Sequence, residues 1–213
     1  PKKYFDLYKK EDIDIAESSD EYLATLPLSA VKSIRAKKNQ INLDIGLAKE
    51  IKEAYYATTS FVDAQVGRIL NKLKESGLDE NTLVVFTSDH GYHLGEHGHW
   101  QKQTLFDNAT RVPLIFAGAG INNKAGISSN SPVELIDIYP TIMEITGIEI
   151  PEHVVGKSLV PLFINSEYNI RNSALTKWRN GYSIKTKRYR ITKWKEEDQF
   201  SWDWDTEKEY KSS

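Results

Sequence analysis

The sequence predicts an α/β fold in which one buried strand ends at a group of chemically reactive side chains. A helix is indicated over 45–73, where apolar residues recur at helical spacing and Gly77 follows as the expected C-terminal glycine. The apolar, β-branched run 83–86 is typical of a strand buried on both faces. Alternating residues over 182–186 and 189–194 predict an antiparallel hairpin.

The remaining elements follow from local patterns along the chain. Residues 9–20 form a charged loop, and the short apolar segment 22–28 is a candidate lining for a substrate entrance. Residues 113–116 predict a second buried strand. Pro140 suits the first position of a helix that closes at Gly147.

Composition excludes some classes of partner. The chain has 213 residues and a formal net charge of −2, with scattered Lys and Arg, which argues against a nucleic acid or a membrane surface as the main partner. No apolar run approaches the roughly 20 residues that a membrane helix needs. The chain has no cysteine, so disulfides are excluded, although this does not fix the cellular compartment.

The active site is predicted to lie at the end of the strand over 83–86. Asp89 and His90 follow it directly, and in open α/β sheets sites form at the carboxyl ends of strands. A carboxylate beside an imidazole can bind a divalent cation. Four of the five histidines lie within 90–99, a clustering that chance does not favour.

The glycine-punctuated loop after His90 is expected to fold back over this site. Its three glycines give it the freedom to bring four side chains near the metal: His93, Glu96, His97 and Lys102. Taken alone, Lys102 would be a surface lysine, but its place in this loop makes it a plausible clamp for an anion. His99 taken alone is more often a solvated or hydrogen-bonded loop histidine.

These residues carry a family resemblance. Residues 89–102 read Asp-His-Gly-Tyr-His-Leu-Gly-Glu-His-Gly-His-Trp-Gln-Lys, and with the segment 104–115 they resemble the sulfatase family, most closely its iduronate-2-sulfatase-like branch. Segments 134–147, 156–162 and 181–190 resemble later parts of the family in the same order. Ser-Asp-His-Gly alone is only moderately specific, because related phosphodiesterases use it.

The resemblance implies a hydrolase of sulfate esters, with sulfated carbohydrates or aryl sulfates as substrates. It implies a divalent cation, usually Ca²⁺, with Asp89 and His90 among its ligands, and Lys102 in contact with the substrate sulfate. His93 is a candidate for the acid that protonates the leaving group. The family nucleophile is a formylglycine made from Cys or Ser in a Cys/Ser-x-Pro/Ala-x-Arg motif, and this chain has neither that motif nor the paired aspartates that complete the metal site.

The resemblance also implies a fold and a domain plan. We expect an alkaline-phosphatase-like α/β/α sandwich, with 1–165 forming the later half of the catalytic domain and 166–213 beginning a small antiparallel C-terminal subdomain. The opening residues resemble a segment midway along the family, so the chain is expected to be a C-terminal fragment whose partner is the missing N-terminal half. Family members are periplasmic, secreted or lysosomal.

Two other functions stay open at this point. A metal-dependent phosphodiesterase or phosphonate hydrolase of the same superfamily would use the same Asp-His pair, and imidazole suits zinc better than calcium. The chain could also be a non-catalytic remnant of a sulfatase, since it lacks the nucleophile.

Overall fold

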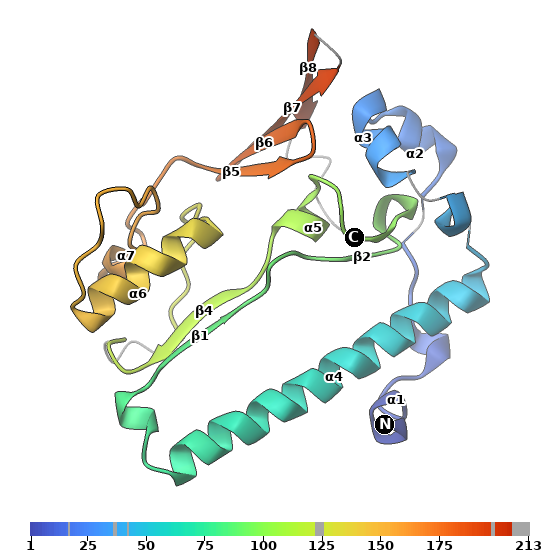
Figure 1. Ribbon diagram of the computed structural model, residues 1–213. Helices are drawn as coiled ribbons and strands as arrows, with labels where there is room; N and C mark the ends of the chain where they lie inside the picture. The colour runs from blue at the N-terminus through green and yellow to red at the C-terminus, as the bar shows by residue number, and fades with distance from the viewer. Residues whose placement is uncertain (17, 36–37, 42, 122–125, 197–198, 206–213) are drawn as a thin grey trace. The chain divides into compact units, whose positions relative to one another are not determined.

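The computed structural model describes residues 1–16, 18–35, 38–41, 43–121, 126–196 and 199–205 (Figure 1). The chain divides into two compact units. The first contains residues 1–80 and 90–111, and the second contains residues 81–89 and 112–213.

The first unit is mainly helical. Its elements before the histidine-rich loop are α1 (Lys2–Phe5), the 3₁₀ turn η1 (Lys10–Asp12), α2 (Asp20–Ala24), α3 (Leu28–Ile34), η2 (Lys38–Gln40) and α4 (Ile45–Glu75), and the turn η3 (Asp79–Asn81) follows at the unit boundary.

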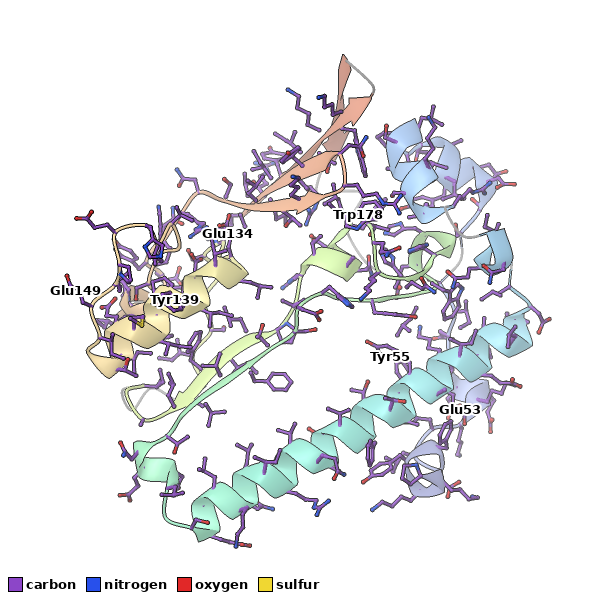
Figure 2. All side chains as sticks on the ribbon, viewed as in Figure 1. Glu53, Tyr55, Glu134, Tyr139, Glu149 and Trp178 are labelled. Carbon is purple, nitrogen blue, oxygen red and sulfur yellow. The ribbon has the colours of Figure 1, made fainter. Side chains whose placement is uncertain are left out.

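The predicted long helix is confirmed as α4. Its first turn is capped by the Asp44 carboxylate, which accepts a hydrogen bond from the Leu47 amide at 3.0 Å. Its end is set by Gly77, which adopts the left-handed conformation (φ 66°) that the sequence predicts for this position. Side chains project from α4 along its whole length, among them Tyr55, whose ring lies 5.3 Å from that of Tyr92 (Figure 2).

The N-terminal segment packs on α4. The ring of Tyr4 meets Phe61 edge to face at 5.5 Å. The hydroxyls of Tyr8 and Ser60 lie 2.6 Å apart. Within the predicted charged loop 9–20, the described residues form η1 and bury Ile13, so this part of it is more regular than predicted.

The histidine-rich loop also belongs to the first unit. It forms β2 (His93–Leu94), η4 (Glu96–Gly98), β3 (Trp100–Gln101) and α5 (Asp107–Thr110), with β2 and β3 antiparallel. A side chain at Gly91 would place its Cβ 2.0 Å from the carbonyl oxygen of Asn108, so only glycine allows α5 to approach this closely. The loop is thus a packed structure, in which Gly91 allows α5 to lie close to the backbone.

The second unit begins with the predicted strand. β1 (Leu83–Thr87) pairs antiparallel with β4 (Leu114–Gly118), which confirms both strands. The prediction that they are buried on both faces was wrong for this chain. Phe86 and its cross-strand partner Ile115 are 44% and 54% exposed. The reason is that these two side chains share one face of the sheet, whereas Phe163 packs against Phe116 on the other face.

The opposite face of this two-stranded sheet is covered. Phe116 of β4 contacts Phe163, with ring centroids 5.3 Å apart. Phe163 lies in α7 (Val160–Ile164), which follows η5 (Leu135–Asp137) and α6 (Ile138–Thr146). The helix predicted to start at Pro140 begins two residues earlier, because a proline is tolerated anywhere in the first turn, where amides lack helical partners. It ends at Gly147, as predicted.

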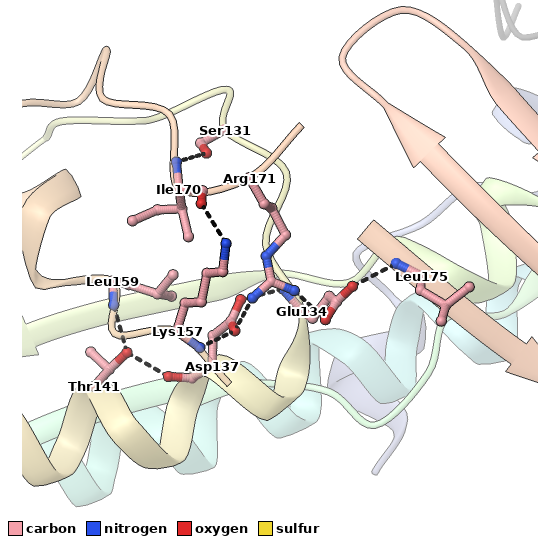
Figure 3. Close-up of polar contacts among 9 residues, drawn as sticks. All are labelled: Ser131, Glu134, Asp137, Thr141, Lys157, Leu159, Ile170, Arg171 and Leu175. Carbon is pink, nitrogen blue, oxygen red and sulfur yellow. Dashed lines mark hydrogen bonds and ion pairs between the residues drawn. The ribbon is translucent and has the colours of Figure 1, made fainter. Parts of the chain in front are cut away.

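A buried ionic network fixes the start of α6 (Figure 3). Asp137 is fully buried, and its carboxylate accepts hydrogen bonds from the amides of Glu134 and Lys157, both at 2.8 Å. The Arg171 guanidinium bridges the carboxylates of Asp137 and Glu134. Glu134 also accepts from the Leu175 amide at 2.6 Å, so the network joins α6 to the first strand of the C-terminal sheet.

That sheet has four antiparallel strands in chain order, β5 (Ser173–Trp178), β6 (Gly181–Thr186), β7 (Arg190–Glu196) and β8 (Gln199–Asp205). The predicted hairpin is confirmed as β6 and β7, and the sequence missed the strands on either side. At the β5–β6 turn, the Arg179 guanidinium lies over the ring of Trp178 at 4.4 Å (Figure 2). The sheet occupies the predicted C-terminal segment, and the exact domain boundary at residue 165 stays a prediction.

Among the helices that the structure describes, none combines the length and the apolar character needed to cross a membrane.

Candidate active-site loop

The predicted metal pair follows the end of β1. The strand stops at Thr87, whose hydroxyl donates to the Pro113 carbonyl of the neighbouring chain segment at 2.9 Å. Asp89 comes two residues later and is exposed. His90, bonded to it, is the first residue of the histidine-rich loop and is half-buried.

The hydrogen bonds of His90 fix the position of its ring proton. Its Nδ1 lies 2.8 Å from the carbonyl oxygen of Gly91, an acceptor, so the ring proton belongs on Nδ1. The lone pair is then on Nε2, which faces the Lys102 ammonium at 2.6 Å. Metal-binding histidines commonly hold Nδ1–H on a backbone carbonyl in this way, with the lone pair on Nε2. In this structure that lone pair accepts from Lys102.

Asp89 and His90 each carry a group that divalent cations bind. Asp89 offers carboxylate oxygens and His90 offers an imidazole nitrogen, which suit a divalent cation. Within the described part of the chain, no group of three His, Cys, Asp or Glu side chains is placed to hold a metal ion. A complete metal site would therefore need further ligands.

Lys102 is the loop residue that meets His90. Its side chain is exposed, and its ammonium is the group that donates to Nε2. The residues on either side have unusual backbone conformations for non-glycine residues, with φ 121° at Gln101 and 76° at Gln103. The backbone therefore presents Lys102 from a tight, strained turn.

His93 lies in the interior of the loop. It has no exposed surface, and its Nε2 hydrogen-bonds with the Thr104 hydroxyl at 2.8 Å. Burial, with smaller contributions from the positive charges of His99 and His97, lowers its pKa from 6.5 to about 3. These contacts hold a neutral ring in the interior of the loop, and the role of His93 as the general acid stays a prediction.

Glu96 and His97 make contacts within the loop and with the N-terminal segment. The Glu96 carboxylate accepts from the Leu94 amide at 2.6 Å. His97 Nδ1 lies 2.7 Å from the Tyr22 hydroxyl, and the two rings stack. Burial lowers the pKa of His97, an effect opposed by the charge of Glu96 and by a hydrogen bond with the Asn108 side chain. The segment 22–28, predicted to line an entrance, thus places Tyr22 against this loop.

The buried position of His99 was not predicted from the sequence. It is 3% exposed, and its ring nitrogens lie 2.8 Å from the carbonyl oxygen of Ile34 and 3.0 Å from that of Lys102. The clustering of histidines was the available signal, but no local pattern connects positions 34 and 99.

Comparison with protein families matches the chain over most of its length. The family model described as "Sulfatase" matches residues 2–148. A second model, described as "N-sulphoglucosamine sulphohydrolase, C-terminal", matches residues 95–211 and so includes the C-terminal sheet.

Two curated relatives are similar along nearly the whole chain. A sulfatase of Formosa agariphila is 35% identical, over 92% of this chain and 39% of its own length. The human iduronate 2-sulfatase is 29% identical, over 91% of this chain and 49% of its own length. The chain therefore spans between about two fifths and one half of these relatives.

Solved structures show the same fold. One, determined in complex with its substrate D-glucosamine-2-N,6-O-disulfate, superposes with a TM-score of 0.68 and 28% identity, covering 81% of this chain and 38% of the other. The phosphonate monoester hydrolase of Silicibacter pomeroyi has a TM-score of 0.83 at 23% identity, covering 95% of this chain and 46% of the other. The fold is the predicted alkaline-phosphatase-like α/β class.

Proposed function

This chain belongs to the sulfatase family, and we propose that it supplies one part of the metal and sulfate site of an enzyme that hydrolyses sulfate esters of carbohydrates. The observation that carries the proposal is the contact between Lys102 and His90. It places a cation at the Nε2 lone pair of an imidazole, within the family motif that follows a strand in the sequence.

The proposed metal ligands in this chain are Asp89 and His90, with Ca²⁺ as the proposed ion. The hydrogen bond from His90 Nδ1 to the Gly91 carbonyl supports this role, because it puts the ring's lone pair on Nε2, where a cation would take the place of the Lys102 ammonium. When bound, a divalent cation supplies Lewis-acid stabilisation of negative charge on a sulfuryl oxygen. The remaining ligands would come from a part of the protein outside this chain.

Lys102 is proposed to bind the sulfuryl group. A sulfate monoester carries negative charge on oxygens that an ammonium can neutralise, and a cation fixed in advance stabilises charge that shifts during hydrolysis. The strained turn that holds Lys102 supports a role that needs a fixed position. The nucleophile, proposed to be a formylglycine, is not encoded here, since the chain has no cysteine and no serine in the required motif.

Similarity to characterised proteins supports a sulfated sugar as substrate. The family model over residues 95–211 is named for an N-sulphoglucosamine sulphohydrolase, and one similar structure holds a disulfated glucosamine. We propose the same class of substrate for the protein that contains this chain, and we propose that it is an iduronate-2-sulfatase-like enzyme.

A substrate panel tests the proposal. The full-length protein containing this chain is purified and assayed with sulfated glucosamines, sulfated uronic acid disaccharides, an aryl sulfate, an aryl phosphate and a phosphonate monoester. We expect release of sulfate from sugar substrates, loss of turnover after chelation and recovery with Ca²⁺. Faster turnover of the phosphonate monoester, restored best by Zn²⁺, would instead favour the phosphonate hydrolase alternative. No turnover of any ester would favour the non-catalytic alternative.

A further inference from the structure

The turn that carries Lys102 needs an external constraint. Gln101 and Gln103 both have positive φ, at 121° and 76°, although neither is glycine. Such conformations are sparsely populated in L-residues and persist only where the surrounding structure holds them. Something must therefore fix the backbone of Lys102 between them.

The ring of His99 is in contact with that backbone. Its Nε2 lies 3.0 Å from the carbonyl oxygen of Lys102. Its Nδ1 lies 2.8 Å from the carbonyl oxygen of Ile34, the last residue of α3. Carbonyls in the last turn of a helix have no partner within the helix, so Ile34 provides an acceptor anchored in a separate element. The ring therefore connects the Lys102 turn to the end of α3.

The two contacts also indicate the protonation state of the ring. Carbonyl oxygens only accept hydrogen bonds, so His99 satisfies both contacts only when both nitrogens carry a proton. The neighbouring rings do not compete for that proton. The pKa of His93, whose ring centroid lies 4.9 Å away, and the pKa of His97 are both lowered, chiefly by burial.

We propose that His99, as an imidazolium bridging Ile34 and Lys102, is a positioning residue that holds the Lys102 ammonium in place beside His90. The ring does not touch substrate. It acts through Lys102, because it hydrogen-bonds to the Lys102 backbone carbonyl. The side chain of the same lysine reaches His90 Nε2 at 2.6 Å. The inference rests on the proposed function, since it assigns His99 to the placement of the sulfate-binding lysine.

Two substitutions separate positioning from packing. In His99→Gln the side-chain amide nitrogen replaces Nε2 and can still donate to the Lys102 carbonyl. In His99→Asn it replaces Nδ1 and can donate only to the Ile34 carbonyl. Both variants bury one amide and lose one hydrogen bond. If His99 served packing alone, the two substitutions should therefore lower kcat/KM equally. His99→Ala removes both contacts, and His153→Ala at an exposed position is the control for loss of a histidine.

The first measurement is steady-state hydrolysis of a sulfated glucosamine by the full-length protein, with inhibition by inorganic sulfate. A displaced charge-stabilising group costs on the order of 10²-fold in catalytic efficiency. We expect that loss in kcat/KM for His99→Asn and His99→Ala, with weaker sulfate inhibition. His99→Gln should lie within about 10-fold of the wild type. Equal losses for the Gln and Asn variants, or a better Asn variant, would overturn the inference.

The second measurement does not depend on catalysis. In chelator-treated, ¹⁵N-histidine-labelled full-length protein, both ring nitrogens of His99 should show protonated signals. The His90 Nε2 signal, which reports the contact with Lys102, should shift in His99→Asn but not in His99→Gln. A singly protonated His99 ring, or an unchanged His90 signal in His99→Asn, would contradict the inference. If these signals behave as expected while the wild type hydrolyses no sulfate ester, the proposed function fails and the link between His99 and Lys102 stands.

Discussion

At the residue scale, Lys102 and Asp89 are expected to have different roles. The Lys102 ammonium carries a positive charge, so it would bind an anion and not a metal, whereas Asp89 offers carboxylate oxygens to a cation. In the full-length protein, Lys102→Ala should lower kcat/KM by about 10²- to 10³-fold, the scale of removing one preorganised charge-stabilising group. Its metal content, measured by atomic emission, should barely change.

Asp89→Ala should instead lower metal occupancy together with rate, because it removes a carboxylate ligand. Its activity should recover in part at high Ca²⁺ concentration, whereas that of Lys102→Ala should not. The exposed His153→Ala variant serves as the control for both measurements. If Lys102→Ala lost metal while Asp89→Ala kept it, the assignment of roles on this loop would be wrong.

His93 gives the protein a specific dependence of stability on pH. Its pKa is lowered to about 3 in the folded state from 6.5, so between these values the unfolded chain binds the extra proton. The contribution of the neutral His93 ring to the free energy of unfolding is therefore fully present above about pH 6.5. It is lost as the pH falls toward 3, at ~1.4 kcal/mol per pH unit per proton.

The test is urea unfolding of His93→Gln from pH 7 to pH 4. Glutamine can keep a hydrogen bond to Thr104 but does not titrate, so the free energy of unfolding should fall less steeply with acid. Some slope should remain, because the pKa of His97 is also lowered by burial. An acid slope identical to that of the wild type would show that His93 is not a buried neutral histidine.

At the element scale, the network at the start of α6 is expected to dominate the local stability of the second unit. Arg171 balances two carboxylates, those of Glu134 and the fully buried Asp137 (Figure 3). Arg171→Met keeps much of the side-chain volume but leaves buried negative charge without a partner. Such a change should lower the free energy of unfolding by about 3–5 kcal/mol.

An exposed ion pair provides the matched control. Lys72 and Glu75 lie 3.5 Å apart on α4, and their side chains are 76% and 67% exposed. Glu75→Ala should change the free energy of unfolding by no more than about 0.5 kcal/mol, since water screens such a pair. Chemical denaturation measures both variants. Equal effects of Arg171→Met and Glu75→Ala would mean that the buried network contributes no more than a surface pair.

At the scale of the whole molecule, much apolar surface is exposed. Phe86 and Ile115 lie uncovered on the sheet of β1 and β4, and Ile69 on α4 is 68% exposed. Sheets with so few strands also present unpaired edges that can join other chains. Because exposed apolar patches of this kind promote association, we expect the 213-residue chain on its own to self-associate.

The isolated chain is also expected to have no sulfatase turnover, because its sequence lacks the nucleophile motif. In addition, the residues that the structure describes hold no group of three possible metal ligands. Analytical ultracentrifugation and an aryl sulfate assay check the two expectations. A monomer that unfolds cooperatively, independently of concentration, would contradict the first. Hydrolysis by the pure chain that is abolished in Asp89→Asn would contradict the second.

The sequence by itself determined the features that depend on local pattern. Helical spacing and Gly77 predicted α4, apolar runs predicted β1 and β4, and alternation predicted the β6–β7 hairpin. The motif from Asp89 to the lysine thirteen residues later predicted the family. These features come from neighbours within a few residues, so periodicity and side-chain type are enough to recognise them.

Only the tertiary structure decided which side chains meet and which are buried. It places Lys102 beside His90, joins His99 to Ile34 across 65 positions, and withdraws His93 from solvent. Arg171 likewise reaches Asp137 across 34 positions. Contacts at such separations leave no periodic trace, and the pKa of a histidine follows from its burial and charged neighbours, which exist only once the chain has folded.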